Sequence, residues 1–224
     1  MLENPFPLFE QFAHRLRVTI FRREDAFSDA AALRHFDGAG GASLWQVHGG
    51  ESIVVRQPTE RAEKADGIAT DTTGLVLSIR WADCQNFVIY APNQHVVGIL
   101  HAGWRGLAAD ALANHYALLK EKWGILPEET YIGAGPSLCT ACAEFSDPAH
   151  ELPSADPQFF HGKHVDLRGI ADAQLDAIGV PRIQRERIEN CTCCCPNEYW
   201  TYRGGDRESV LSGRTNALAC MLLA

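Results

Sequence analysis

The chain has 224 residues, of which 46% are hydrophobic, and carries a net charge of −8 at pH 7. This length and composition allow one large domain with a sizeable core. The negative charge gives no electrostatic support for binding nucleic acid. The first residues contain neither an apolar signal segment nor a run long enough to cross a bilayer. We therefore expect a cytoplasmic protein that binds neither nucleic acid nor membranes.

Eight cysteines are present, and four of them bunch at Cys191, Cys193, Cys194 and Cys195. A small secreted domain would use such a number for disulfides, but this chain is large, and neighbouring cysteines pair poorly with each other. We expect reduced thiols, some buried and some binding metal.

The first half of the chain reads as strands separated by polar or glycine-rich stretches. Residues 28–35 predict a short helix, the glycines at 38–41 a flexible break, and the polar stretch 58–64 a surface loop or short helix. The stretches with strand character are 12–21, 45–56 and 75–80.

Two short apolar runs, 86–90 and 96–100, are separated by a turn at Pro92 and predict a hairpin. Cys84 stands before the first run and His101 directly after the second, so both fall at the same end of the hairpin. His48 lies upstream in a loop punctuated by glycines. Together, these three side chains form a candidate Cys/His/His site.

The second half mixes helices with strands. Apolar residues at helical spacing predict helices over 107–123 and 166–178, whereas 129–133, 199–203 and 216–223 predict strands. The regular alternation and glycine fingerprint of a doubly wound sheet are missing, and so is a phosphate-binding P-loop. We therefore predict an α+β architecture with mixed sheets, as a single domain spanning 1–224.

Several short motifs follow one another along the chain. In order, they are Gln46-Val47-His48-Gly49, Ala65-Asp66-Gly67, Ala82-Asp83-Cys84, His101-Ala102-Gly103-Trp104-Arg105-Gly106, Ile132-Gly133 with Pro136, Cys191-Thr192, Tyr202-Arg203 and Gly213-Arg214. This order resembles the multicopper polyphenol oxidoreductase (laccase-like) family, also called the LACC-type purine nucleoside phosphorylase or peptidoglycan editing factor family. The resemblance covers Leu44 to the C-terminus and implies a four-layer α/β/β/α arrangement.

The resemblance also implies a zinc ion held by His48, Cys84 and His101. Zinc accepts thiolate sulfur and imidazole nitrogen, and three protein ligands with one open position are typical of catalytic zinc. The open position can hold a water of lowered pKa or polarise a substrate atom. Copper is the less favoured ion.

We predict catalytic roles for Cys84, Arg105 and Asp83. The planar guanidinium of Arg105 could hold phosphate, or it could pair with a structural carboxylate. Asp66 and Asp83 are either partners that orient the histidines or simple turn residues, and the partner role is favoured for Asp83. For Trp104, packing is favoured over stacking on a base.

The function implied by the resemblance is zinc-dependent phosphorolysis of purine nucleosides, with purine nucleoside and phosphate as substrates and with adenosine deaminase and methylthioadenosine phosphorylase activities alongside. One alternative is a cysteine-dependent hydrolase or amidase that edits peptidoglycan precursors, with Cys84 as nucleophile and His101 as base. A copper-dependent polyphenol oxidase ranks low, because two histidines and one cysteine are too few for several copper ions. A purely structural zinc is disfavoured by the missing fourth ligand.

Cys139 and Cys142 have the two-residue spacing of a metal knuckle, and the dense group Cys191 to Cys195 could complete a four-sulfur site. We expect the second group to lack the same two-residue spacing, and only Cys191 of this group falls in one of the ordered motifs. Buried or redox-sensitive thiols are therefore favoured over a second metal site.

Overall fold

The computed structural model describes the chain from Met1 to Ala224, apart from the side chains of Glu60 and Ala62. Most of its strands form two six-stranded mixed sheets. The first sheet has the order β1 (Leu2–Glu3), β2 (Leu16–Phe21), β14 (Asn216–Leu222), β7 (Leu75–Trp81), β3 (Gly40–Trp45), β5 (Thr59–Lys64). The second has the order β13 (Arg185–Arg187), β10 (Tyr131–Ala134), β8 (Gln85–Ala91), β9 (Val96–Ala102), β6 (Gly67–Thr70), β4 (Ser52–Val54).

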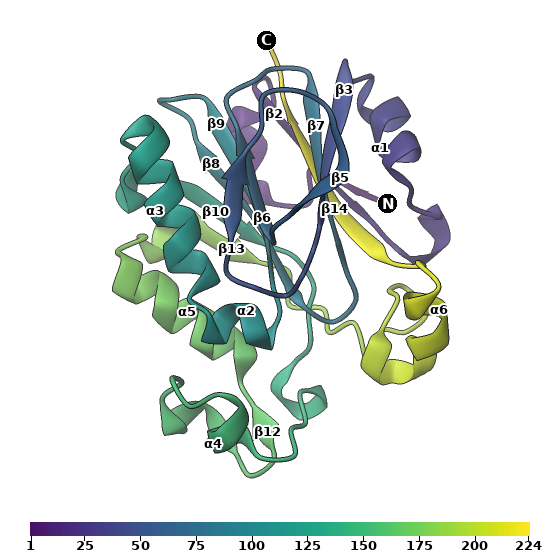
Figure 1. Ribbon diagram of the computed structural model, residues 1–224, viewed down its shortest axis with the longest axis vertical. Coiled ribbons are helices and arrows are strands. Elements are labelled where there is room, and N and C mark those ends of the chain that lie inside the picture. Colours follow the sequence, from purple (N-terminus) through teal and green to yellow (C-terminus); the bar gives the residue numbers. More distant parts are fainter.

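Helices lie on the outer faces of both sheets (Figure 1). The helices are α1 (Asp29–Phe36), α2 (Trp104–Ala108), α3 (Ala111–Trp123), α4 (Pro148–Glu151), α5 (Leu167–Ile178) and α6 (Arg207–Leu211). In Figure 1, α1 covers the first sheet, while α2, α3 and α5 cover the second. A two-stranded ribbon of β11 (Phe160–His161) and β12 (His164–Val165) lies beside α4.

Three separate apolar clusters show how these layers are held together. Along β8, Val88 and Tyr90 point into the cluster between the sheets, whereas Phe87 and Ile89 point into the cluster under α2, α3 and α5. This follows from the two-residue period of a strand. A third cluster, which includes Phe36, joins α1 to the outer face of the first sheet. The predicted α+β class and mixed sheets are confirmed, and the packing is that of four layers.

The helix predicted over 107–123 is interrupted. Asp110 adopts a left-handed conformation with φ of 54°, so α2 ends and α3 begins as a separate helix. The helix predicted over 166–178 is confirmed as α5, where the Asp166 carboxylate accepts the Gly169 amide and Gly179 ends the helix with φ of 98°.

Four local predictions were wrong. Of the strand predicted over 45–56, Trp45 ends β3 and only Ser52–Val54 form β4, because residues 46–51 form the loop of His48. The expected flexible break at 38–41 overlaps β3, because Gly40 lets this strand approach Pro58 closely: a Cβ there would stand 2.3 Å from the Pro58 ring. The polar stretch 58–64 forms β5, an edge strand beside β3. Residues 199–203 form no strand, because Asn216 takes up the backbone N–H and C=O of Trp200.

The hairpin that carries the candidate site is confirmed. β8 and β9 are antiparallel, and their register pairs Gln85 with Ala102 and Asn86 with His101. Cys84 and His101 therefore lie at the same end of the hairpin, as predicted. Among the helices that the structure describes, none is long and apolar enough to span a bilayer.

Candidate active site

The loop that carries His48 runs between β3 and β4 and is organised by one buried carboxylate. Asp66 accepts hydrogen bonds from the backbone amides of Val47 at 3.2 Å, His48 at 2.9 Å and Gly49 at 2.7 Å. His48 itself has a positive φ of 61°, a conformation that needs such support. The loop thereby presents the His48 ring at the surface.

The same carboxylate fixes His101. Nδ1 of His101 lies 2.9 Å from Oδ1 of Asp66, and both side chains are buried. Burial by itself raises the pKa of Asp66, but the hydrogen bond from His101 and those from the Gly49 and His48 amides outweigh burial and lower this pKa. Because an ionised carboxylate only accepts, Nδ1 of His101 carries a proton, and Nε2 is the ring nitrogen left to bind a metal in place of its own proton.

Cys84 follows a tight turn at Asp83, whose φ is 78°. The backbone carbonyl of Asp83 accepts the Leu138 amide at 3.1 Å, and its carboxylate accepts the Thr192 hydroxyl at 2.7 Å and the Arg203 amide at 2.8 Å. Asp83 thus braces the turn before Cys84, whereas the carboxylate bonded to the histidines is that of Asp66. A catalytic role for Asp83 stays a prediction.

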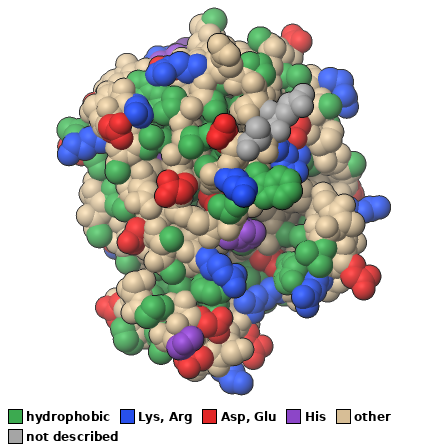
Figure 2. Space-filling view, in the orientation of Figure 1, with side chains coloured by type: hydrophobic (Ala, Val, Ile, Leu, Met, Phe, Trp, Pro, Cys, Tyr) green, Lys and Arg blue, Asp and Glu red, His purple; other side chains and the backbone are tan. Residues whose placement is uncertain are grey.

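His48, Cys84 and His101 converge. One ligand atom from each lies within 4.8 Å of the other two, and the imidazole rings meet edge to face at 4.9 Å. His101 is buried and His48 is exposed, so the site opens to solvent on one side. Figure 2 shows a histidine side chain at the surface near the middle of this face, with basic side chains above and below it.

The donor set fits a metal such as zinc, which binds thiolate and imidazole together. Gly103 leaves room for the sulfur of Cys84, because a Cβ on Gly103 would stand only 2.8 Å from Cys84 Sγ. Gly103 begins α2, where its φ of −66° is open to any residue. Glycine is therefore needed at this position to avoid a clash with Cys84, and not for its backbone conformation.

Charges within the site favour a thiolate. Burial alone raises the pKa of the Cys84 thiol, but the charge and hydrogen bond of His101, together with those of His48, lower it to about 6. Burial alone lowers the pKa of His101, and Cys84 and Asp66 raise it to about 9. An ionised sulfur beside imidazole is suited to binding a metal and also to nucleophilic attack.

Arg105 lies on α2, close in sequence to His101. Its guanidinium stacks on the Trp104 ring at 4.1 Å, and no carboxylate among the described side chains forms an ion pair with it. Trp104 also packs edge-on against Phe145 at 5.8 Å, so its favoured packing role is confirmed. The charge of Arg105 is free for an anion.

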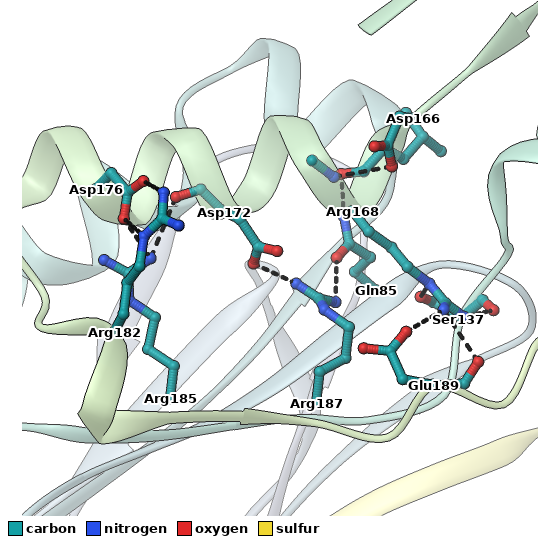
Figure 3. Close-up of polar contacts among 12 residues, drawn as sticks. Gln85, Ser137, Asp166, Arg168, Asp172, Asp176, Arg182, Arg185, Arg187 and Glu189 are labelled. Atoms are coloured by element: carbon teal, nitrogen blue, oxygen red, sulfur yellow. Dashed lines mark hydrogen bonds and ion pairs between the residues drawn. The ribbon is translucent and has the colours of Figure 1, made fainter.

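The four arginines drawn in Figure 3 are already paired with carboxylates. Arg187 binds Asp172 at 2.6 Å and Arg185 binds Asp176 at 2.8 Å around a cavity of about 240 Å³ between α5 and β13. Arg187 also donates to the side chain of Gln85, the residue after Cys84, at 2.9 Å. These arginines hold α5 against the second sheet and position the start of β8.

Two residues near Cys84 had no predicted role of their own. Thr192 is buried and bonded to Asp83, and Arg203 donates its amide to the same carboxylate. Both belong to motifs that the sequence displayed, Cys191-Thr192 and Tyr202-Arg203. Their contact with Asp83 required the fold, because more than a hundred residues separate them from it along the chain.

The structure also brings four other cysteines together: Cys139, Cys142, Cys191 and Cys194 have sulfurs within 4.8 Å of one another. Cys191 and Cys194 are themselves separated by two residues, so the expectation that the second group lacks this spacing was wrong. Cys193 and Cys195 lie outside the cluster.

The family model described as multi-copper polyphenol oxidoreductase laccase matches residues 25–222. Together with the fold and the His48, Cys84, His101 cluster, this match shows that the chain belongs to that family. The resemblance seen in the sequence is thus confirmed.

Curated relatives are similar over part of their length. The chain is 30% identical over 159 residues to "Purine nucleoside phosphorylase YlmD" of Geobacillus stearothermophilus, covering 66% of this chain and 57% of the relative. It is 30% identical over 167 residues to "Adenosine deaminase RL5" from an unknown prokaryotic organism, covering 68% and 61%. The aligned part therefore spans about three fifths of these relatives.

Solved structures share the fold. The crystal structure of YlmD from Geobacillus stearothermophilus superposes with a TM-score of 0.79 at 22% identity, covering 98% of this chain and 94% of the other. The Neisseria meningitidis protein NMB0706 superposes with a TM-score of 0.74 at 20% identity, covering 95% and 96%. At these identities the likeness concerns the fold.

Proposed function

We propose that this protein is a zinc-dependent purine nucleoside phosphorylase, with adenosine deamination and methylthioadenosine phosphorolysis as further activities of the same site. The observation that carries the proposal is the convergence of His48, Cys84 and His101 around one point open to solvent. Family membership and the names of the curated relatives support it. A zinc ion with an open position supplies a water of lowered pKa or polarises a substrate atom.

The residues of the chain divide the remaining work. Asp66 keeps the proton on Nδ1 of His101 and holds the His48 loop, so that both rings stay oriented. Asp83 holds the turn that presents Cys84. Phosphorolysis needs a phosphate anion beside C1′ of the ribose. We assign the binding of this anion to the unpaired guanidinium of Arg105.

A reducing compartment suits this site. All eight cysteines are free thiols, including Cys84 and the exposed Cys194. Exposed thiols persist in the cytoplasm, where disulfides are rare. We therefore assign the protein to the cytoplasm.

The direct test incubates metal-replete protein with adenosine, inosine or methylthioadenosine, with and without phosphate, and identifies the products by chromatography. A pentose 1-phosphate that forms only with phosphate (ribose 1-phosphate from adenosine or inosine, 5-methylthioribose 1-phosphate from methylthioadenosine) supports phosphorolysis, and inosine formed from adenosine supports deamination. If neither product forms with any of the nucleosides, the purine assignment is wrong.

Arg105→Ala separates the two reactions. Phosphorolysis should fall roughly tenfold or more, since a hydrogen bond to a charged group contributes about 1.5 to 3 kcal/mol. Deamination should change little, because it needs no anion. Arg182→Ala is the control, since Arg182 is exposed and already paired with Asp176. Equal loss of both reactions in Arg105→Ala would show a structural role for Arg105.

A second candidate is cysteine-dependent hydrolysis or amide editing of cell-wall precursors. The observation that favours it is the lowered pKa of Cys84 beside His101, which is the pairing of an activated nucleophile with its base. This chemistry would need no metal at Cys84.

Cys84→Ser separates the two candidates. Loss of metal together with loss of activity supports Cys84 as a ligand, because a serine hydroxyl is a poor replacement for thiolate sulfur. Unchanged metal content with lost activity, or a covalent adduct on wild-type Cys84 detected by mass spectrometry, would favour the hydrolase.

A further inference from the structure

Four cysteines on two loops converge outside the site of His48, Cys84 and His101. Cys139 and Cys142 lie on the loop after β10, and Cys191 and Cys194 lie on the loop after β13. All four sulfurs lie within 4.8 Å of one another. Cys194 Sγ is 3.5 Å from Cys142 Sγ and 3.9 Å from Cys139 Sγ.

Each pair is presented by a single tight turn. The Cys139 carbonyl accepts the amides of Cys142 at 3.0 Å and Ala143 at 3.1 Å, and the Cys191 carbonyl accepts the amide of Cys195 at 2.9 Å. Such a turn directs the two sulfurs of a Cys-x-x-Cys segment to one side. Two such segments facing each other form a four-thiolate knuckle.

One hydrogen bond joins the pairs through sulfur. The Cys139 amide donates to Cys191 Sγ at 3.3 Å, and residues Ser137 and Cys191 form a parallel β-bridge. An amide hydrogen bond stabilises a negatively charged sulfur, which is the form in which cysteine binds metal.

We propose that Cys139, Cys142, Cys191 and Cys194 bind a single zinc ion that joins the two loops as a structural clip. The sulfur spacing supports a mononuclear site, because a tetrahedron with Zn–S bonds of about 2.3 Å has edges of about 3.8 Å. An iron–sulfur cluster would hold its cysteines farther apart, since several irons would stand between them. Disulfides would draw the sulfurs into pairs at about 2.05 Å, whereas Cys194 faces both Cys139 and Cys142.

The clip is connected through Thr192 to Asp83, in the turn before Cys84. Thr192 lies between the two cysteines of the second loop, and its hydroxyl donates to Asp83. Arg168 of α5 links the two loops at residues that precede their cysteines. Its guanidinium donates to the carbonyl of Ser137 at 2.7 Å and to that of Asn190 at 3.0 Å (Figure 3). The zinc would link the two loops a second time, in addition to Arg168, and so keep Thr192 in contact with Asp83.

The first experiment measures metal per chain by elemental analysis of protein purified without added metal and then reloaded with zinc. Wild-type protein should bind two equivalents. Cys142→Ser and Cys194→Ser should each lose one equivalent, and His101→Ala should lose the other. Cys195→Ser is the matched control, because Cys195 lies outside the cluster, and it should keep two equivalents.

Cobalt reports the ligands directly. Wild-type protein loaded with Co²⁺ should show the intense sulfur-to-metal absorption of a four-thiolate site, and this absorption should persist in His101→Ala. The test requires no activity, so it stands whether or not the proposed nucleoside chemistry holds. Wild-type protein that binds a single equivalent, lost in His101→Ala, would overturn the clip.

Alkylation tests the clip in unmodified protein, which avoids variants that fail to fold. Cys194 is exposed, so an empty site would leave it accessible to an alkylating reagent. With zinc bound, iodoacetamide should spare the four cluster cysteines, and a chelator should expose them, as mapped by mass spectrometry. Rapid labelling of Cys194 in zinc-loaded protein, or a Cys142–Cys194 disulfide in freshly purified protein, would contradict the proposal.

Discussion

At the scale of single residues, one carboxylate does more for the site than its place in a short turn motif suggests. Asp66 is buried, and each of its carboxylate oxygens accepts two hydrogen bonds. One oxygen accepts the backbone amides of Val47 and Gly49. The other accepts the backbone amide of His48 and the ring Nδ1–H of His101. Removing its charge would free both histidines at once. Asp83, by contrast, is bonded to Thr192 and Arg203.

We therefore expect Asp66→Asn to weaken metal affinity at the His48, Cys84, His101 site by roughly 10- to 100-fold, the usual cost of losing a partner behind a metal ligand. Asp83→Asn should weaken it less, because Asp83 contacts neither histidine. Competition with a chromogenic chelator measures both affinities. A larger loss in Asp83→Asn than in Asp66→Asn would contradict this assignment.

Gly103 gives a second test at the same scale. In Gly103→Ala, the new Cβ would stand 2.8 Å from Cys84 Sγ, so the sulfur must move. Activity should fall roughly 100-fold, the scale that a misplacement of about 1 Å causes. Gly41→Ala in β3 is the control, since its Cβ would meet only the Val76 carbonyl, at 3.9 Å. Equal activity of the two variants would show that the site tolerates the added methyl group.

At the scale of elements, α3 is seated on the second sheet through a buried histidine. His115 Nδ1 lies 2.9 Å from the Ser52 hydroxyl, and its Nε2 has no partner among the described residues. Gly67 and Gly98 make room for the ring, since a Cβ at either position would stand 2.9 Å or 2.3 Å from a His115 nitrogen. Glycine at these two strand positions therefore lets the His115 ring pack against the sheet.

The burial of His115 predicts that stability depends on pH. Burial lowers the pKa of His115 from 6.5 to about 4, so between these values the unfolded chain binds a proton that the folded chain does not. The free energy of unfolding should fall by roughly 3 kcal/mol as the pH drops through this window. In His115→Gln this part of the decline should disappear, as urea unfolding at several pH values can measure. Identical pH profiles would contradict a neutral buried His115.

At the scale of the whole molecule, the two sheets share one core, and the loops that form the site extend from it. Leu77 on β7 is fully buried in this core. Leu77→Ala should cost about 2 to 5 kcal/mol of unfolding free energy, through lost burial and the cavity left behind. Leu211→Ala, at a side chain 71% exposed, should change stability by less than about 0.5 kcal/mol. Denaturant unfolding compares the two variants, and a similar cost for both would contradict a shared core between the sheets.

Local pattern alone determined much of this protein. The β8–β9 hairpin, its turn and the placement of Cys84 and His101 at one end all follow from alternating apolar runs, because strand pairing across a short turn is a local event. The helix α5 follows in the same way from its periodicity, the Asp166 cap and Gly179. The ordered motifs also indicated the family, and with it the expectation that His48, Cys84 and His101 hold one metal ion.

Tertiary structure decided the rest, because the deciding contacts join residues far apart in the chain. The β5 strand forms although its sequence is polar, since β3 offers it an edge. The α2–α3 break, the bonding of His101 to Asp66 rather than Asp83, and the cluster of Cys139, Cys142, Cys191 and Cys194 likewise depend on segments that meet only after folding. A sequence pattern can show which ligands are available, but which of them share one metal depends on distances that the packing of the layers sets.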